Sequence, residues 1–202
     1  MTASEQRENP LRDGPLRRTL EVLHLTSIGL WLGIVVMSGV VAAVMFTVMP
    51  DLRPALPDYA LLPPEEQATL AAGHLQNQIF LVADVFQFVL GLLALGSLIG
   101  LLTVCKLPVR RISSAVRMIG LGVALGLFSY HLMVLAPSMQ TELTLYQAAA
   151  RDGMLDLAAQ HRENFRADHP TASRVLTGIA VGLLSTMVGA AYSVASLGGD
   201  ET

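Results

Sequence analysis

Asp84 is the residue whose type and position say most about the chemistry available to this chain. It is the only carboxylate well inside a long apolar run, and the helical spacing of Gln76, Asp84 and Gln87 places two amides on its face. His131 lies at a comparable depth in another run, which is expected to run in the opposite direction. Because an unpaired polar group in a bilayer is costly, we expect Asp84 and His131 to be in contact.

This contact has two interpretations. It can be a structural ion pair or hydrogen bond that fixes the register of two helices, which we favour, or it can be a proton or metal site. The candidate supporting side chains are the amides of Gln76 and Gln87, the adjacent Tyr130, and Arg174, which is an alternative partner for Asp84.

The histidines offer a metal site as an alternative. His74, His131 and His169 are expected on the outer side together with His161, and neutral imidazole is a common ligand of zinc and copper. However, no two of them have the i, i+4 spacing of a helical metal motif, and no cluster of cysteine or methionine joins them. A metal ion held by His74, His131 and His169 is therefore the weaker prediction.

Haem and enzyme chemistry are disfavoured. His24, with Glu21 one turn before it and Arg117 at a similar level, is expected at the opposite end of the bundle from His131, so the two histidines cannot sandwich one haem. The chain has no Gly-x-Ser-x-Gly elbow, no Gly-x-x-x-x-Gly-Lys phosphate loop and no His-Glu-x-x-His motif. We expect no cofactor and no enzymatic activity.

Four long and predominantly apolar runs carry these side chains. About 20 apolar residues in a helix cross the roughly 30 Å hydrocarbon core, where a helix satisfies the backbone of a single segment. The expected fold is all-α, an integral membrane four-helix up-down bundle. The predicted spans are residues 20–49, 79–104, 112–136 and 172–197.

Each run also contains one Gly-x-x-x-Gly motif. Residues four apart share a helix face, so each pair makes a flat strip where a second helix can approach closely. We expect all four strips to lie inside the bundle, so that leucine in place of Gly29 or Gly122 would overpack it. The pairs are Gly29 and Gly33, Gly96 and Gly100, Gly122 and Gly126, and Gly178 and Gly182.

The remaining segments are expected to lie outside the bilayer. Residues 1–16 and 200–202 are predicted to be tails of a single membrane domain, residues 17–199. Residues 51–78 and 138–170 are predicted to form a small helical cap on the outer side. Within the cap, Pro63 and Pro64 begin a helix, Gly153 breaks one, and His169-Pro170-Thr171 restarts the chain into the fourth span.

Composition and charge agree with a membrane protein. Of the 202 residues, 52% are hydrophobic and 14% are charged, and the net charge of −3 argues against a nucleic-acid partner. Eight basic residues fall on the side that holds both termini and the loop between spans two and three, and five fall on the other side. Because lysine and arginine are enriched in cytoplasmic loops, both termini are predicted to be cytoplasmic. A single cysteine, Cys105, excludes an internal disulfide.

Two stretches resemble the transmembrane protein 205-like family, four-span membrane proteins whose bacterial members lack an assigned activity. One runs from His24 through Trp31 to Met49-Pro50 and on to Gln76-Asn77-Gln78-Ile79-Phe80, and the other is Asn164-Phe165-Arg166-Ala167-Asp168-His169. The resemblance covers roughly residues 20–195. Asp51 departs from the family pattern, in which a basic residue often follows the proline. The resemblance implies a link to the tolerance of drugs and metal compounds, which animal members show.

Together these features predict a non-enzymatic protein of the bacterial inner membrane that serves as an accessory or small-solute tolerance module. A metal-handling protein for copper or zinc is one alternative, and a structural subunit of a larger membrane complex is another. The expected partners are the lipid bilayer and either further copies of the chain or other subunits, with no nucleic acid.

Overall fold

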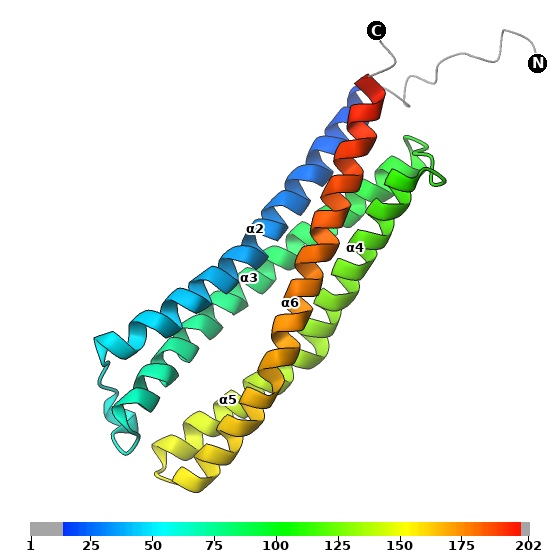
Figure 1. The fold of residues 1–202 in the computed structure, drawn as a ribbon. Helices are drawn as coiled ribbons and strands as arrows, with labels where there is room; N and C mark the ends of the chain where they lie inside the picture. Colours follow the sequence, from blue (N-terminus) through cyan, green and yellow to red (C-terminus); the bar gives the residue numbers. More distant parts are fainter. Residues whose placement is uncertain (1–13, 199–202) are drawn as a thin grey trace, which may run out of the picture. The chain divides into compact units, whose positions relative to one another are not determined.

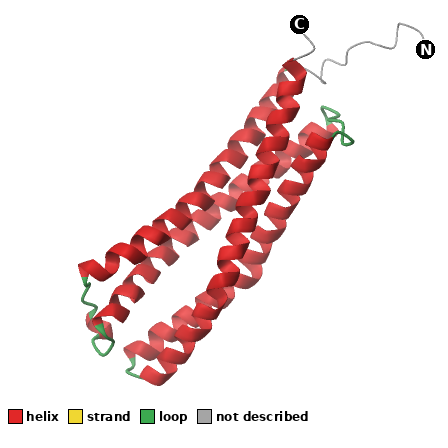
Figure 2. Ribbon diagram, in the orientation of Figure 1, coloured by secondary structure: helices red, strands yellow, loops and turns green. Residues whose placement is uncertain are grey.

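The computed structural model describes residues 14–198, which are almost entirely helical (Figures 1 and 2). No strand occurs among these residues, and four helices are long and apolar enough to cross a membrane, judged by length and composition. The predicted all-α fold class is confirmed. In chain order the elements are α2 (Pro15–Leu52), the 3-10 turn η1 (Pro57–Tyr59), α3 (Pro64–Thr103), α4 (Ile112–Tyr130), the π-turn η2 (His131–Leu135), α5 (Ala136–Arg151) and α6 (Leu155–Gly198).

The ends of the helices differ in part from the prediction. α3 begins at Pro64 as expected, with Glu65 and Glu66 at the positive end of its dipole. The predicted break at Gly153 is confirmed, and its positive φ of 75° suits glycine. The predicted restart at His169-Pro170-Thr171 is wrong, since α6 passes through Pro170 without a break. One missing backbone hydrogen bond does not outweigh the contacts that hold the helix on either side of the proline.

The predicted tails fall almost wholly outside the described residues. The tail predicted over residues 200–202 lies outside the described residues, and so does most of the tail predicted over residues 1–16. The end of the latter prediction is wrong, since Pro15 and Leu16 already belong to α2.

A π-turn carries the third apolar segment past its predicted end at residue 136. The backbone N–H of Ala136 donates to the carbonyl of His131, five residues earlier, so α4, η2 and α5 form one helical segment, Ile112–Arg151. Pro137, in the first turn of α5, has no N–H, and in a regular α-helix its ring would meet the carbonyl of Met133. The wider π-turn relieves this clash, and the helix continues instead of ending.

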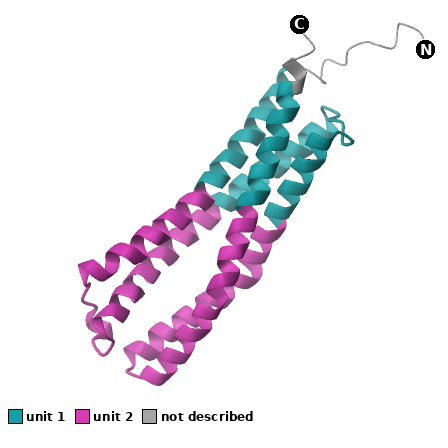
Figure 3. Cartoon of the chain, viewed as in Figure 1, with its two compact units in different colours: residues 1–33, 86–125, 180–202 teal, residues 34–85, 126–179 magenta. Residues whose placement is uncertain are grey.

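The described chain belongs to two compact units, each built from parts of several helices (Figure 3). Unit 1 comprises residues 1–33, 86–125 and 180–202, and unit 2 comprises residues 34–85 and 126–179. In unit 1, α2 and α3 run antiparallel, because Leu20 lies against Gly100 whereas Trp31 lies against Gly91. This up-down pairing is the one expected of helices joined in sequence.

In unit 1, α4 and α6 also run antiparallel, with their backbones nearly in contact. A methyl group built on Gly120 would lie 2.6 Å from Oγ1 of Thr186, and one built on Gly182 would lie 2.8 Å from the carbonyl oxygen of Gly120. Only glycine permits such an approach. We call this contact the α4–α6 seam. It is formed by Ser113, Arg117, Gly120 and Ala124 on α4 and by Gly182, Thr186, Gly189 and Ser193 on α6.

The prediction that all four glycine strips lie inside the bundle is wrong for most of their members. A Gly-x-x-x-Gly motif defines a flat face, but the larger apolar residues around it decide where that face points. Nothing lies within 4 Å of a methyl group built on Gly29, Gly33, Gly96, Gly122 or Gly126. The members that do contact a neighbouring helix are Gly100, Gly178 and Gly182.

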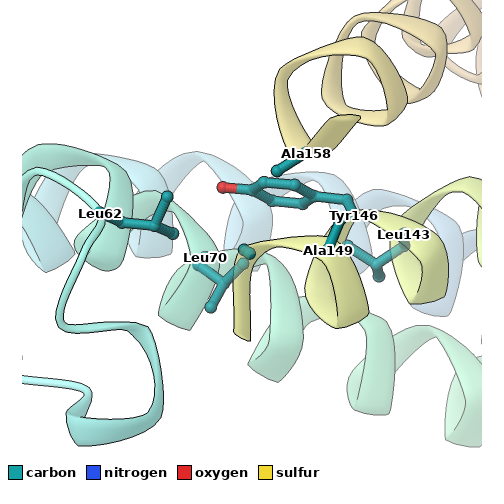
Figure 4. Packing of buried hydrophobic residues seen from close by; sticks show 7 residues of the cluster. Leu62, Leu70, Leu143, Tyr146, Ala149 and Ala158 are labelled. Carbon is teal, nitrogen blue, oxygen red and sulfur yellow. The ribbon is translucent and has the colours of Figure 1, made fainter. Parts of the chain in front are cut away.

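In unit 2, the segments predicted to form the cap share an apolar core, and they are helical except for the connection between α2 and α3 and the turn between α5 and α6 (Figure 4). Tyr146 of α5 lies in this core between residues of the start of α3 and Ala158 of α6. α5 and α6 run antiparallel here, since Ser138 bonds to Asp168 at 3.2 Å and Glu142 to His161 at 2.8 Å. The buried members are Leu62, Leu70, Leu143, Tyr146, Ala149, Ala150 and Ala158.

The connection between α3 and α4 is anchored in unit 1 by two buried side chains. Cys105 and Leu107 pack with Leu101, whose carbonyl accepts a hydrogen bond from the backbone N–H of Leu107 at 3.0 Å. Between them, Lys106 has a φ of 53°, a conformation that residues with a side chain rarely adopt. Burial raises the pKa of the Cys105 thiol, since desolvation penalises the thiolate, so the thiol is a poor nucleophile at neutral pH.

Candidate functional site

Unit 2 brings Asp84 and His131 together. Nε2 of His131 lies 3.3 Å from Oδ2 of Asp84, and the two side chains are 11% and 13% exposed, respectively. An ionised carboxylate only accepts hydrogen bonds, so the imidazole donates, at a distance slightly longer than is usual for an N–H···O bond. The contact expected from the sequence is present, and it joins α3 to the π-turn.

The π-turn determines how His131 is presented. His131 is its first residue, and the ring of Phe128 stacks on the imidazole with centroids 6.3 Å apart and planes 24° apart. Nδ1 of His131 is buried and has no hydrogen-bond partner among the described residues. π-turns occur frequently at functional sites because they alter the direction of a side chain within an otherwise regular helix. Pro137 thus acts on the pair indirectly, through the turn that it favours.

The two amides predicted to support the pair each form a hydrogen bond with α2. In unit 2, Nε2 of Gln76 donates to the carbonyl of Ser38 at 3.4 Å. In unit 1, Oε1 of Gln87 accepts from Nε1 of Trp31 at 3.0 Å. Both amides therefore link α3 to α2. The side chains of Tyr130 and Arg174, the other two supporting candidates, are exposed.

Unit 1 contains a buried ion pair that we did not predict. Nη1 and Nη2 of Arg117 donate to Oε1 and Oε2 of Glu21 at 3.2 and 2.8 Å, and the Arg117 side chain is fully buried. Two parallel bonds between a guanidinium and a carboxylate are both stronger and more directional than one. The pair joins α2 to α4, and either charge alone would be costly to bury.

His24, one turn after Glu21, completes this polar interior. Its Nδ1 lies 2.9 Å from the carbonyl of Ala94 and 3.0 Å from Oγ of Ser97, and the residue is fully buried. A carbonyl only accepts, so Nδ1 carries the proton and the lone pair of the neutral ring is on Nε2. Nε2 has no partner among the described residues. His24 therefore joins α2 to α3 through the hydrogen bonds of its Nδ1.

A sequence signal for this interior exists. The buried face of α2 repeats at intervals of four and three, and its first three members are ionisable. Asp84 was selected because it lies deep within an apolar run. That criterion takes no account of which helix face a residue lies on, so it does not identify these residues. The face consists of Arg17, Glu21, His24, Ile28, Trp31 and Val35.

The structure does not gather His74, His131 and His169 into one ligand set. Across residues 14–198, no three or more side chains of His, Cys, Asp or Glu are grouped so that they could hold a metal ion. His74 is exposed, and His169 packs edge-on against Phe165 with ring centroids 5.1 Å apart. The convergence on which the metal hypothesis depends is not found in this part of the chain.

No family model, no curated protein and no solved structure matches the chain. The resemblance to the transmembrane protein 205-like family therefore rests only on the two stretches given above, His24 to Phe80 and Asn164 to His169, and stays a prediction.

Proposed function

We propose that this chain is a non-enzymatic, multi-pass protein of the bacterial inner membrane that serves as an accessory module in tolerance to small solutes. Both termini lie on the cytoplasmic side in this proposal. Four helices of sufficient length and apolarity support the membrane location. The tolerance role follows from the family resemblance described above.

One observation carries the non-enzymatic part of the proposal. The ionisable side chains in the interior are used to join helices, as Glu21 does with Arg117 and Asp84 does with His131. Paired in this way, charges that would be costly alone fix the register of α2 against α4 in unit 1 and of α3 against the π-turn in unit 2.

A deletion strain tests the proposal. Cells without the gene are challenged with copper salts, platinum compounds and organic cations, and are complemented with the wild type, Asp84→Asn, or the exposed control Asp58→Asn. We expect the deletion to lower tolerance to at least one compound and all three genes to restore it, since asparagine keeps an acceptor for His131. Unchanged tolerance in the deletion strain would contradict the proposal. Failure of Asp84→Asn alone, at normal protein level, would instead give the pair a proton or metal role.

A specific observation favours a structural subunit as a second candidate. In the 18-residue apolar stretch that marks α2 as a candidate span, only 11% is buried within the chain. In the corresponding stretches of the other three candidate spans, 33–39% is buried. A helix so little covered by its own chain is available to a neighbouring subunit. Purification at native expression level, followed by mass measurement in mild detergent, distinguishes the two candidates. A stable mass above that of one chain supports the subunit, and a monomer excludes it.

A further inference from the structure

The loop between α3 and α4 presents three basic side chains to the outside of unit 1. Lys106, Arg110 and Arg111 are exposed, and their side chains make no hydrogen bond or ion pair with another described residue. In unit 2, by contrast, three of the five arginines have side-chain partners: Arg151 bonds to Tyr59, Arg162 to Glu66 and Arg166 to Glu163. The positive charge of the loop is therefore left for a partner outside the described chain.

The backbone of this loop gives an independent reason to expect a function. Lys106 holds a φ of 53° between the buried Cys105 and Leu107, where glycine would fit with less strain. With its two neighbours fixed in the interior, the lysine side chain is directed outward. A strained backbone position that carries a charged side chain suggests that the charge is used.

Apolar side chains accompany the basic ones. Val109 is 52% exposed and Ile112, at the start of α4, is 84% exposed, although both flank arginines. A free inorganic anion would leave these two side chains in water. The boundary between headgroups and acyl chains, in contrast, accommodates apolar and basic side chains together.

We propose that residues 106–112 form a docking surface for anionic phospholipid headgroups, with Lys106, Arg110 and Arg111 on the phosphates and Val109 and Ile112 at the acyl boundary. Near an anionic membrane surface, each basic residue contributes about fivefold in affinity. The proposal rests on the membrane location proposed above, but it does not depend on the tolerance role.

The test uses the full-length protein in a neutral detergent. Phosphatidylglycerol or phosphatidylcholine is added, and the lipids retained are counted by native mass spectrometry. Arg110→Gln with Arg111→Gln removes two loop charges, and Arg166→Gln with Arg174→Gln is the matched control, since both control arginines are exposed in unit 2. We expect the loop variant to bind phosphatidylglycerol about 25-fold more weakly and the control to bind as the wild type does.

A second variant separates lipid binding from folding. Lys106→Gly removes a charge but suits the positive φ, so its melting temperature should not fall while its affinity for phosphatidylglycerol falls about fivefold. Equal retention of the two lipids by the wild type, or equal losses in the loop and control variants, would overturn the docking surface. Because this readout needs no cellular phenotype, it fails or succeeds independently of the tolerance experiment.

Discussion

The guanidinium of Arg117 makes two bonds to one buried carboxylate, so a single substitution leaves a charge without its partner. Arg117→Met should destabilise the protein by about 3–5 kcal/mol because Glu21 stays buried and unpaired. Adding Glu21→Gln should recover part of the loss, since the uncompensated charge disappears. Chemical unfolding in detergent measures both variants, with the exposed Arg18→Met as control. An effect of Arg117→Met no larger than that of the control would refute the importance of the pair.

The Asp84–His131 contact is longer and partly exposed, so a smaller effect is expected. Asp84→Ala should cost about 1–3 kcal/mol because it strands the imidazole, and Asp84→Asn should cost less since its amide oxygen still accepts a hydrogen bond. A double-mutant cycle with His131→Ala gives the coupling energy directly. Asp58→Ala, an exposed carboxylate of unit 2, is the control. A coupling energy of zero within error would show that the two side chains stabilise the protein independently.

At the scale of elements, two glycines of α4 provide a matched comparison. Gly120→Ala would place its methyl group 2.7 Å from the carbonyl oxygen of Gly182, so the α4–α6 seam must open. We expect a loss of about 1–3 kcal/mol. Gly122→Ala meets nothing within 4 Å and should raise stability by about 0.5–1 kcal/mol, through the greater helix propensity of alanine. The melting temperatures of the two variants in detergent test this expectation. A higher melting temperature for Gly120→Ala than for Gly122→Ala would contradict the close contact of α4 and α6.

At the scale of the whole molecule, the orientation predicted from the basic residues can be tested by labelling. The buried Cys105 supplies a silent background, because its raised pKa leaves little thiolate at neutral pH. Asp58→Cys and Arg110→Cys place thiols at exposed positions of the two predicted sides. A membrane-impermeant maleimide should label position 58 in intact cells and position 110 only after permeabilisation. The reverse pattern would invert the orientation.

The sequence was sufficient for the helices and for one contact, because both depend on strong local signals. An apolar run of bilayer length has no alternative to a helix, and a carboxylate isolated within one needs a partner at its own depth. Which face of each helix points into the bundle could not be predicted in the same way. Gly122 and Gly120 are two residues apart, yet only the spacing of Gly120 with Ser113, Arg117 and Ala124 distinguishes the buried one.

The sequence pattern also did not predict that the helices continue past Pro137 and Pro170. Pro137 suggested the end of the third span and Pro170 the start of the fourth, but both lie inside continuous helical segments. Whether a proline ends a helix depends on the contacts of the residues that follow it, such as those of Tyr146 and Ala158 in unit 2. Such contacts are properties of the assembled fold, so no local pattern reports them.

The π-turn has a consequence for how the length of this chain can change during evolution. A regular helix turns by about 100° per residue, so losing one residue rotates everything after it. The π-turn holds one residue more than an α-turn, so removing Met133, which is 80% exposed, together with Pro137→Ala, which removes the clash of the ring, should yield a regular helix whose flanking faces keep their directions. α5 contains no extra residue of this kind, so deletion of the exposed Leu145 should rotate the residues after it and disrupt the core around Tyr146. Residues 131–135 are thus where a homologue that is one residue shorter, and that lacks the proline at position 137, could align without a change of fold.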